Sequence, residues 1–182
     1  MPSITLDIKG LNETISKFDK FNKTVQTDIK DEVNASALAI QSNAKKLAPV
    51  NLGTLRNGIY LVEQSVSKDK FMFSVGADAS YAPYIEFGTG GKVSIPNGYE
   101  SYASQFKTKT GGTFKDMIKA LTMWVERKGI ASGKKPKSVA YMIALSILRK
   151  GLRPHPFLIP AFEQEKPKLK LRIEKILKNV KS

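Results

Sequence analysis

The apolar positions of the first fifty residues change their period at Gly10. Before it, every second residue from Ile4 to Ile8 is apolar, which predicts a strand with one buried face. From Leu11 to Leu47 the apolar residues recur every three or four positions, as on one side of a helix. Because Pro49 disfavours the α conformation of the residue before it, we expect this long helix to end near Leu47.

Two strands and an aromatic stretch follow the long helix. Tyr60–Val66 and Phe71–Ala77 predict a hairpin. Tyr81–Phe87 is rich in aromatic residues but contains Pro83, which cannot donate to a central ladder. We interpret it as an edge strand or a bent segment, and as the natural third member of a meander. The strand at 4–8 can supply a fourth. The predicted fold is therefore α+β, an antiparallel sheet of three to four strands packed on a long helix, with additional C-terminal helices.

The second half of the chain predicts helices joined by irregular segments. Lys92–Gly112 is polar and contains glycines, so we expect a flexible loop. A capping-box pattern at Thr113–Asp116 begins one helix, and a second helix ends at Gly151. Pro154–Pro160 contains three prolines and is expected to be an extended strap. A last helix follows, kinked or restarted at Pro167.

A chain of 182 residues is long enough for one domain with its own core. We predict a single α+β domain over 1–182. Its parts are a helix-plus-meander core at 1–91, the flexible loop at 92–112, a helical insertion at 113–151, and the proline strap with the C-terminal helix at 152–182.

Positive charge gathers in the second half of the chain. The formal net charge is +14, yet residues 1–50 hold seven basic and six acidic side chains, and residues 51–100 hold four and five. Residues 101–150 hold eleven basic and two acidic side chains, and residues 151–182 hold eight and three. A polyanion or an acidic protein surface is therefore expected to face the C-terminal part.

Several classes of protein are disfavoured by composition. The chain has no cysteine and a single histidine, so a thiolate nucleophile, a disulfide framework and a histidine-rich metal site are excluded. No apolar run approaches the roughly 20 residues that span a bilayer, and the first ten residues do not resemble a signal peptide. We expect a soluble protein, intracellular when made, with no cofactor and no membrane partner.

The residues that could carry catalysis do not form a recognisable set. Gly88-Thr-Gly-Gly-Lys92 departs from both the Walker and the dinucleotide-binding patterns, so a structural turn is favoured. Glu86 could be an acid or base after burial among aromatic residues, but a structural carboxylate, paired with a cation such as Arg56 or with backbone donors, is favoured. His155 could act as a general base, although packing is the commoner role. We predict that the protein is not an enzyme.

The remaining candidates are docking residues. The aromatic stretch and the strap offer apolar side chains beside glycine and proline, and we expect subunit contacts there. The interface candidates are Tyr81, Pro83, Tyr84, Glu86, Phe87, Gly88, Pro156 and Phe157; the structural-turn candidates are Pro49, Gly53 and Arg56; the candidate polyanion contacts are Lys134, Lys135, Lys137, Lys168, Lys170 and Arg172.

Three motifs occur in one order along the chain. They are Ala44-Lys-x-x-Ala-Pro-Val-x-x-Gly-x-Leu-Arg-x-x-Ile59, then Val75-Gly76 followed by Tyr81-Ala-Pro-Tyr-x-Glu-Phe-Gly-Thr89, then Pro154-x-Pro-Phe-Leu-x-Pro-Ala161. Together, over about residues 30 to 165, they resemble the bacteriophage tail-component family, typified by the tenth gene product of a lambdoid long-tailed phage.

The resemblance implies a structural virion protein without catalytic activity. It implies a neck, tail-completion or head-tail joining protein with an α+β fold, located in the virion at the head-tail junction and in the host cytoplasm during assembly. The implied partners are copies of itself in an oligomeric ring, and neighbouring phage connector, portal or tail proteins, with DNA in the channel as a further candidate. A basic DNA-binding accessory protein is the alternative, and a hydrolase a distant one.

Overall fold

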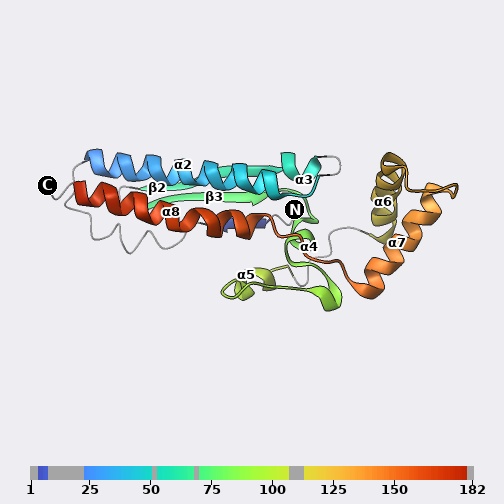
Figure 1. Ribbon diagram of the computed structural model, residues 1–182. Helices are drawn as coiled ribbons and strands as arrows, with labels where there is room; N and C mark the ends of the chain where they lie inside the picture. Colours follow the sequence, from blue (N-terminus) through green and yellow to red (C-terminus); the bar gives the residue numbers. More distant parts are fainter. Residues whose placement is uncertain (1–3, 8–22, 51–52, 68–69, 107–112, 180–182) are drawn as a thin grey trace. The chain divides into compact units, whose positions relative to one another are not determined.

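The computed structural model describes residues 4–7, 23–50, 53–67, 70–106 and 113–179 (Figure 1). The chain divides into two compact units. We call the first the sheet unit, which contains the described residues of 4–78 together with 156–179, and the second the helical unit, which contains those of 79–155. The C-terminal helix thus joins the N-terminal half of the chain. That the whole chain forms a single domain stays a prediction.

The sheet unit contains an antiparallel sheet, so the predicted mixture of helix and antiparallel sheet is confirmed. Its strands are β1 (Ile4–Asp7), β2 (Ile59–Ser67) and β3 (Lys70–Ala77), in the order β1-β3-β2. β2 and β3 form the hairpin that the sequence predicts, with a register shift between Glu63 and Ser65. β1 occupies the other side of β3, where Ile4 pairs with Ala77.

Helix α2 (Lys23–Leu47) supplies the apolar stripe of the sheet unit. Its buried apolar residues recur at steps of three or four, and the helix contacts both β2 and β3. On β3 the alternate residues Phe71, Phe73 and Val75 are buried. The predicted end at Leu47, before Pro49, is confirmed. The buried residues of the stripe are Val25, Ile29, Val33, Ala37, Ile40 and Ala44.

The C-terminal helix α8 (Leu158–Asn179) packs against α2 and runs in the opposite direction (Figure 1). The prediction of an extended strap through Pro160 is wrong, because α8 already begins at Leu158. Proline is tolerated in the first turn of a helix, where a backbone N–H has no partner within the helix. Pro167 lies inside the helix and does not restart it. The segment 8–22, for which a helical stripe was also predicted, lies outside the described residues.

The helical unit begins with a short helix, α4 (Ala82–Phe87), where the sequence predicts an edge strand. That prediction is wrong, because Pro83 is the second residue of the helix, where its missing N–H has no partner to lose. A spacing of three between aromatic residues also fits one side of a helix. The next elements are η2 (Gly90–Lys92) and α5 (Glu100–Ser104), so the predicted loop 92–112 contains a short helix, and its flexibility stays a prediction. Its last part, 107–112, lies outside the described residues.

Two longer helices complete the helical unit, α6 (Phe114–Lys128) and α7 (Pro136–Lys150), which contact each other. The predicted capping box is confirmed, because Thr113 and Asp116 exchange both capping bonds. The bonds from the Thr113 hydroxyl and backbone N–H lower the pKa of Asp116. The cap is therefore complete at neutral pH and is lost as the pH falls through the pKa of the folded state.

Burial on α2 can be tested with two apolar residues of the same helix. Ile40 is 2% exposed and Leu38 is 49% exposed. Ile40→Ala should lower the free energy of unfolding by about 2–5 kcal/mol, since it removes buried methyl groups and leaves a cavity. Leu38→Ala should change it by less than about 0.5 kcal/mol, as is usual at the surface. Urea unfolding followed by circular dichroism measures both, and equal losses would contradict the described packing.

Candidate docking surface

The chain leaving α4 is hydrogen-bonded to the chain leaving α7. Thr89 donates its backbone N–H to the carbonyl of Leu152 at 3.0 Å, and Leu152 donates its N–H to the Thr89 hydroxyl at 2.8 Å. His155 donates its N–H to the carbonyl of Ile85 at 2.7 Å. We call residues 88–90 with 151–152 the glycine clasp. It joins the end of the motif at 81–89 to the segment just before the motif at 154–161.

The clasp requires glycine at two positions. Gly88 and Gly151 have φ of +77° and +74°. A Cβ atom on Gly151 would lie 2.0 Å from the Thr89 carbonyl oxygen, and one on Gly88 would lie 2.7 Å from the Leu152 carbonyl oxygen. These are contacts with backbone atoms, which cannot swing aside. The sequence singles out Gly88 but gives Gly151 only the role of a helix stop.

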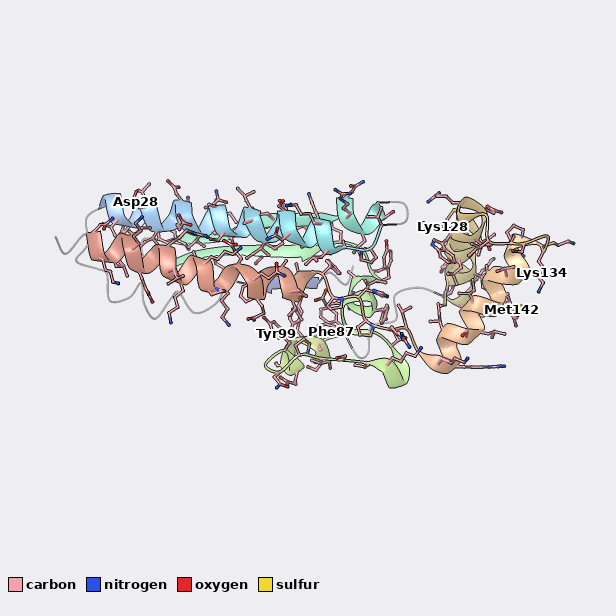
Figure 2. The ribbon with its side chains drawn as sticks, viewed as in Figure 1. Asp28, Phe87, Tyr99, Lys128, Lys134 and Met142 are labelled. Carbon is pink, nitrogen blue, oxygen red and sulfur yellow. The ribbon has the colours of Figure 1, made fainter. Side chains whose placement is uncertain are left out.

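The aromatic stretch contributes to the surface mainly through its first residue. Tyr81 is 40% exposed. Phe87, labelled in Figure 2, is 5% exposed and packs edge-on against Tyr102, with ring centroids 6.2 Å apart. Tyr102 in turn packs against Phe106 at 5.4 Å. Pro83 is also buried, and Tyr84 is partly buried. Phe87 and Pro83 are thus core residues, and Tyr81 is the exposed docking candidate.

The other interface and turn candidates also include both buried and exposed residues. Phe157 is fully buried, while Pro156 next to it is exposed. In the turn after α2, Gly53 has φ of +80° and precedes α3 (Thr54–Asn57), and its carbonyl accepts a bond from Asn57 N–H at 2.7 Å. Pro49 and Arg56 are exposed. The glycine therefore has a conformational role in this turn, as the sequence predicts.

The two titratable candidates lie on neighbouring segments of the helical unit. Glu86 is 2% exposed, and His155 is exposed. They belong to segments joined by the bond from His155 N–H to Ile85. Among the described residues no group of three histidine, cysteine, aspartate or glutamate side chains could hold a metal ion. No helix in the described part of the chain is long and apolar enough to cross a membrane.

Arg172 was predicted to contact a polyanion, and the structure corrects this. Its guanidinium binds the carboxylates of Glu32 and Glu165, and donates to the Ser36 hydroxyl at 2.6 Å. The hydrogen bond to Glu165 raises the pKa of Arg172, with further contributions from Glu32. These groups tie α8 to α2 within the sheet unit. The sequence does not reveal them, because Glu32 and Arg172 are 140 residues apart.

The remaining basic candidates are at the surface. Lys134 and Lys135 are exposed at the turn between α6 and α7, and Lys137 is exposed in the first turn of α7. Lys170 is exposed on α8, and Lys168 lies 3.4 Å from Glu165. Apart from Lys168, these side chains remain candidates for contact with an acidic partner.

One protein family matches the first part of the chain. Residues 12–88 match the family HK97-gp10_like, described as "Bacteriophage HK97-gp10, putative tail-component". The resemblance to the bacteriophage tail-component family is thereby confirmed. The match relates residues 12–88 to a phage tail component. Comparisons with curated proteins and with solved structures found no match.

The HK97-gp10-like match ends at the first residue of the glycine clasp. Its described part contains α2, α3, β2, β3 and α4. Two of the three motifs lie within it or reach its end, and the motif at 154–161 lies beyond it. The family match is therefore shorter than the resemblance, which spans about residues 30 to 165.

The clasp can be tested with two glycines that share a positive φ. Gly151→Ala should destabilise the protein by more than the roughly 1–2 kcal/mol of a left-handed residue, because its Cβ also displaces the Thr89 carbonyl. Gly133, with φ of +79° and nothing within 4 Å of its Cβ position, is the matched control. Hydrogen exchange should show faster exchange of the Thr89 amide only in Gly151→Ala. Equal behaviour of the two variants would contradict the close approach.

The Arg172 network gives a second prediction. Arg172→Met should lower stability by about 1–3 kcal/mol, because it leaves the carboxylate of Glu165, whose side chain is 5% exposed, without its main donor. Lys170→Met on the same helix should have little effect. The double variant Glu165→Met with Arg172→Met should recover part of the loss, since both partners are then apolar. Denaturant unfolding measures the stability of wild type and the three variants. Unchanged stability of Arg172→Met would exclude a structural role for Arg172.

Proposed function

We propose that this protein is a structural component of the phage head-tail junction, a neck or tail-completion protein that joins an oligomeric ring. The observation that carries the proposal is the HK97-gp10-like match over residues 12–88. The proposed partners are further copies of the chain and the adjacent connector, portal or tail proteins. The proposed location is the virion, with assembly in the host cytoplasm.

The sheet unit offers the features that a ring subunit needs. β1 and β2 are the two edge strands of the sheet, and edge strands can be extended by a strand of another chain. α2 and α8 are joined by buried apolar residues and by the Arg172 network, which makes a firm support for such an edge. The exposed Tyr81 offers an aromatic contact of the kind enriched at interfaces.

The exposed lysines favour a second candidate function, a DNA-binding accessory protein. Lys134, Lys135, Lys137 and Lys170 are exposed, and the net charge of the chain is +14. Binding of this kind weakens steeply as salt rises, because it releases counterions from the phosphates. Strong, salt-dependent binding of duplex DNA by the isolated protein, without ring formation, would favour this function over the structural one.

Replacement of Tyr81 tests the docking role without disturbing the core. Tyr81→Ser should leave the circular dichroism and the unfolding midpoint close to wild type, but reduce ring assembly, because it removes exposed aromatic area. Tyr81→Phe should preserve assembly. Phe87→Ser should instead destabilise the protein by about 3–5 kcal/mol, as expected for loss of a buried aromatic ring. Particle mass and electron microscopy, on purified protein and on virions, provide the readout.

Each outcome of this comparison separates folding from assembly. Rings that form equally well with Tyr81→Ser would exclude Tyr81 as a docking residue. Virions in which the protein is absent from the head-tail junction would overturn the proposed function itself, whatever the behaviour of the variants.

A further inference from the structure

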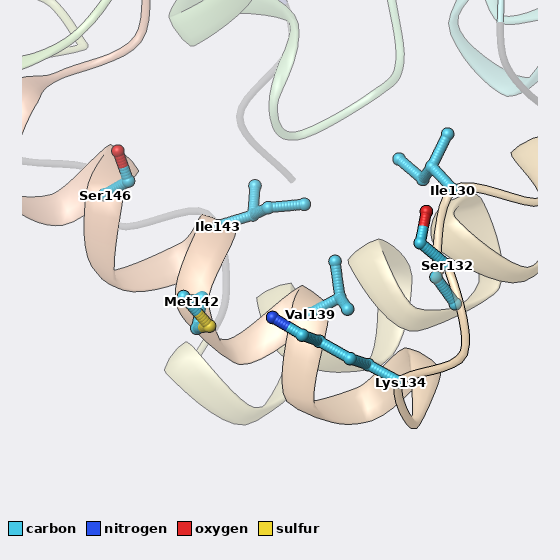
Figure 3. Close-up of a pocket in the computed structure, with 8 residues that line it drawn as sticks. Ile130, Ser132, Lys134, Val139, Met142, Ile143 and Ser146 are labelled. Atoms are coloured by element: carbon cyan, nitrogen blue, oxygen red, sulfur yellow. The ribbon is translucent and has the colours of Figure 1, made fainter.

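The hairpin formed by α6, α7 and the turn between them has an apolar hollow of about 340 Å³. Its walls come from the turn and from one side of α7 (Figure 3). The α7 residues in the wall are spaced by three or four positions, so they form one face of that helix. The wall residues that matter for binding are Ile130, Lys134, Val139, Met142, Ile143 and Ser146.

The apolar wall is open to solvent. Met142 is 63% exposed and Ile130 is 43% exposed. Figure 3 shows Val139 and Ile143 pointing to the same side of α7 as Ile130 of the turn. Methionine is flexible and polarizable, and it is common on surfaces that bind amphipathic helices. A solvent-exposed apolar face with a concave centre is typical of a binding site for another protein.

The hairpin that carries this wall is rich in basic side chains. Between Thr113 and Gly151 the chain holds nine basic and two acidic side chains. One of the two acidic groups, Asp116, is occupied by the cap of α6. Lys134 lines the hollow itself, and its side chain extends toward α7 (Figure 3). Lys128, Lys135 and Lys137 are exposed close by along the chain, and Lys128 and Lys134 are labelled in Figure 2.

We propose that the α6–α7 hairpin binds an acidic amphipathic helix of a neighbouring protein. The basic rim would meet its carboxylates, and the apolar wall around Met142 would take its apolar side chains. This proposal goes beyond the proposed function, which assigns no partner to the hairpin.

The backbone of the hairpin explains why the partner is a helix. Addition of a strand requires an open ladder of backbone N–H and C=O groups. The walls of the hollow are one side of α7 and the turn before it, and a helix interior bonds its backbone groups within itself. A partner must therefore bind through its side chains and satisfy its own backbone, which an amphipathic helix does.

Charge and shape decide between this partner and the others. A second copy of the hairpin carries the same basic rim, so two hairpins face to face would repel each other. DNA phosphates would engage the lysines and leave Met142 and Ile130 in water. An anionic membrane surface suits a convex apolar face, whereas this one is hollow.

Fluorescence anisotropy with the full-length protein tests the proposal. The probe is a labelled helical peptide with leucines along one face and glutamates on the others. It should bind, and the same peptide with glutamine in place of glutamate should bind more weakly. Met142→Asp and Lys134→Glu should each weaken binding of the acidic peptide by roughly tenfold or more. A peptide with lysine in place of glutamate should not bind wild type and should bind better to Lys134→Glu.

Leu171→Asp is the matched control, because Leu171 is an exposed leucine, 66% exposed, on α8 of the sheet unit. It should bind the acidic peptide as wild type does. The proposal is overturned by an acidic peptide that fails to bind, by unchanged binding in Met142→Asp, or by equal binding of the acidic and basic peptides. It is also overturned if duplex DNA or phosphatidylglycerol vesicles bind in a Met142-dependent way and the acidic peptide does not. Ring formation is measured separately, so failure here leaves the proposed function standing.

Discussion

The apolar stripe of α2 is the interaction on which the sheet unit depends. Without it the hairpin of β2 and β3 would leave the buried side of Phe71, Phe73 and Val75 in water, and an isolated two-stranded hairpin has little stability. The same helix contacts α8 and α3, so the C-terminal helix and elements from the first half of the chain meet on it. The positions of the surface residues therefore depend on burial of this stripe.

Polar groups add specificity to this apolar contact. Two long helices with apolar sides can pack in more than one register. The bonds from Arg172 on α8 to Glu32 and Ser36 on α2 select one, because a shift of either helix would separate Arg172 from these two groups. The basic side chains of α8 therefore have two different roles. Arg172 serves the fold, and Lys170 stays available for contact with other molecules.

Sequence periodicity predicted the elements with a long, regular pattern. The apolar stripe of α2 and the alternation in β2 and β3 agree with the structure because each pattern repeats over several turns or residue pairs. The prediction of an edge strand at Tyr81–Phe87 was wrong, because seven residues with a proline fit both a bent edge strand and a first helical turn. Pro160 was interpreted as part of an extended strap, although it lies in the first turn of α8. The first turn of a helix tolerates proline, whereas the interior does not.

The candidate sites depend more on contacts that a sequence does not display. Gly88 was found because three glycines follow one aromatic stretch, but its counterpart Gly151 looked like an ordinary helix end. Only the fold brings the two together. Likewise, the lysines of the α6–α7 turn were visible as charge, whereas the hollow beside Lys134 is formed by that turn and one side of α7. The pattern of residues indicated which side chains to consider, and the fold decided what surrounds them.

The glycine clasp has a consequence for how this chain can vary. Thr89 and Leu152 are bonded to each other, so the sixty or so residues between them leave and return at a single point. We call the segment between these fixed ends a cassette. Its length and sequence can change with a small entropic cost and without displacing Thr89 or Leu152. The family match stops where the cassette starts. Insertions, deletions and substitutions can therefore be accommodated there while Thr89 and Leu152 keep their places.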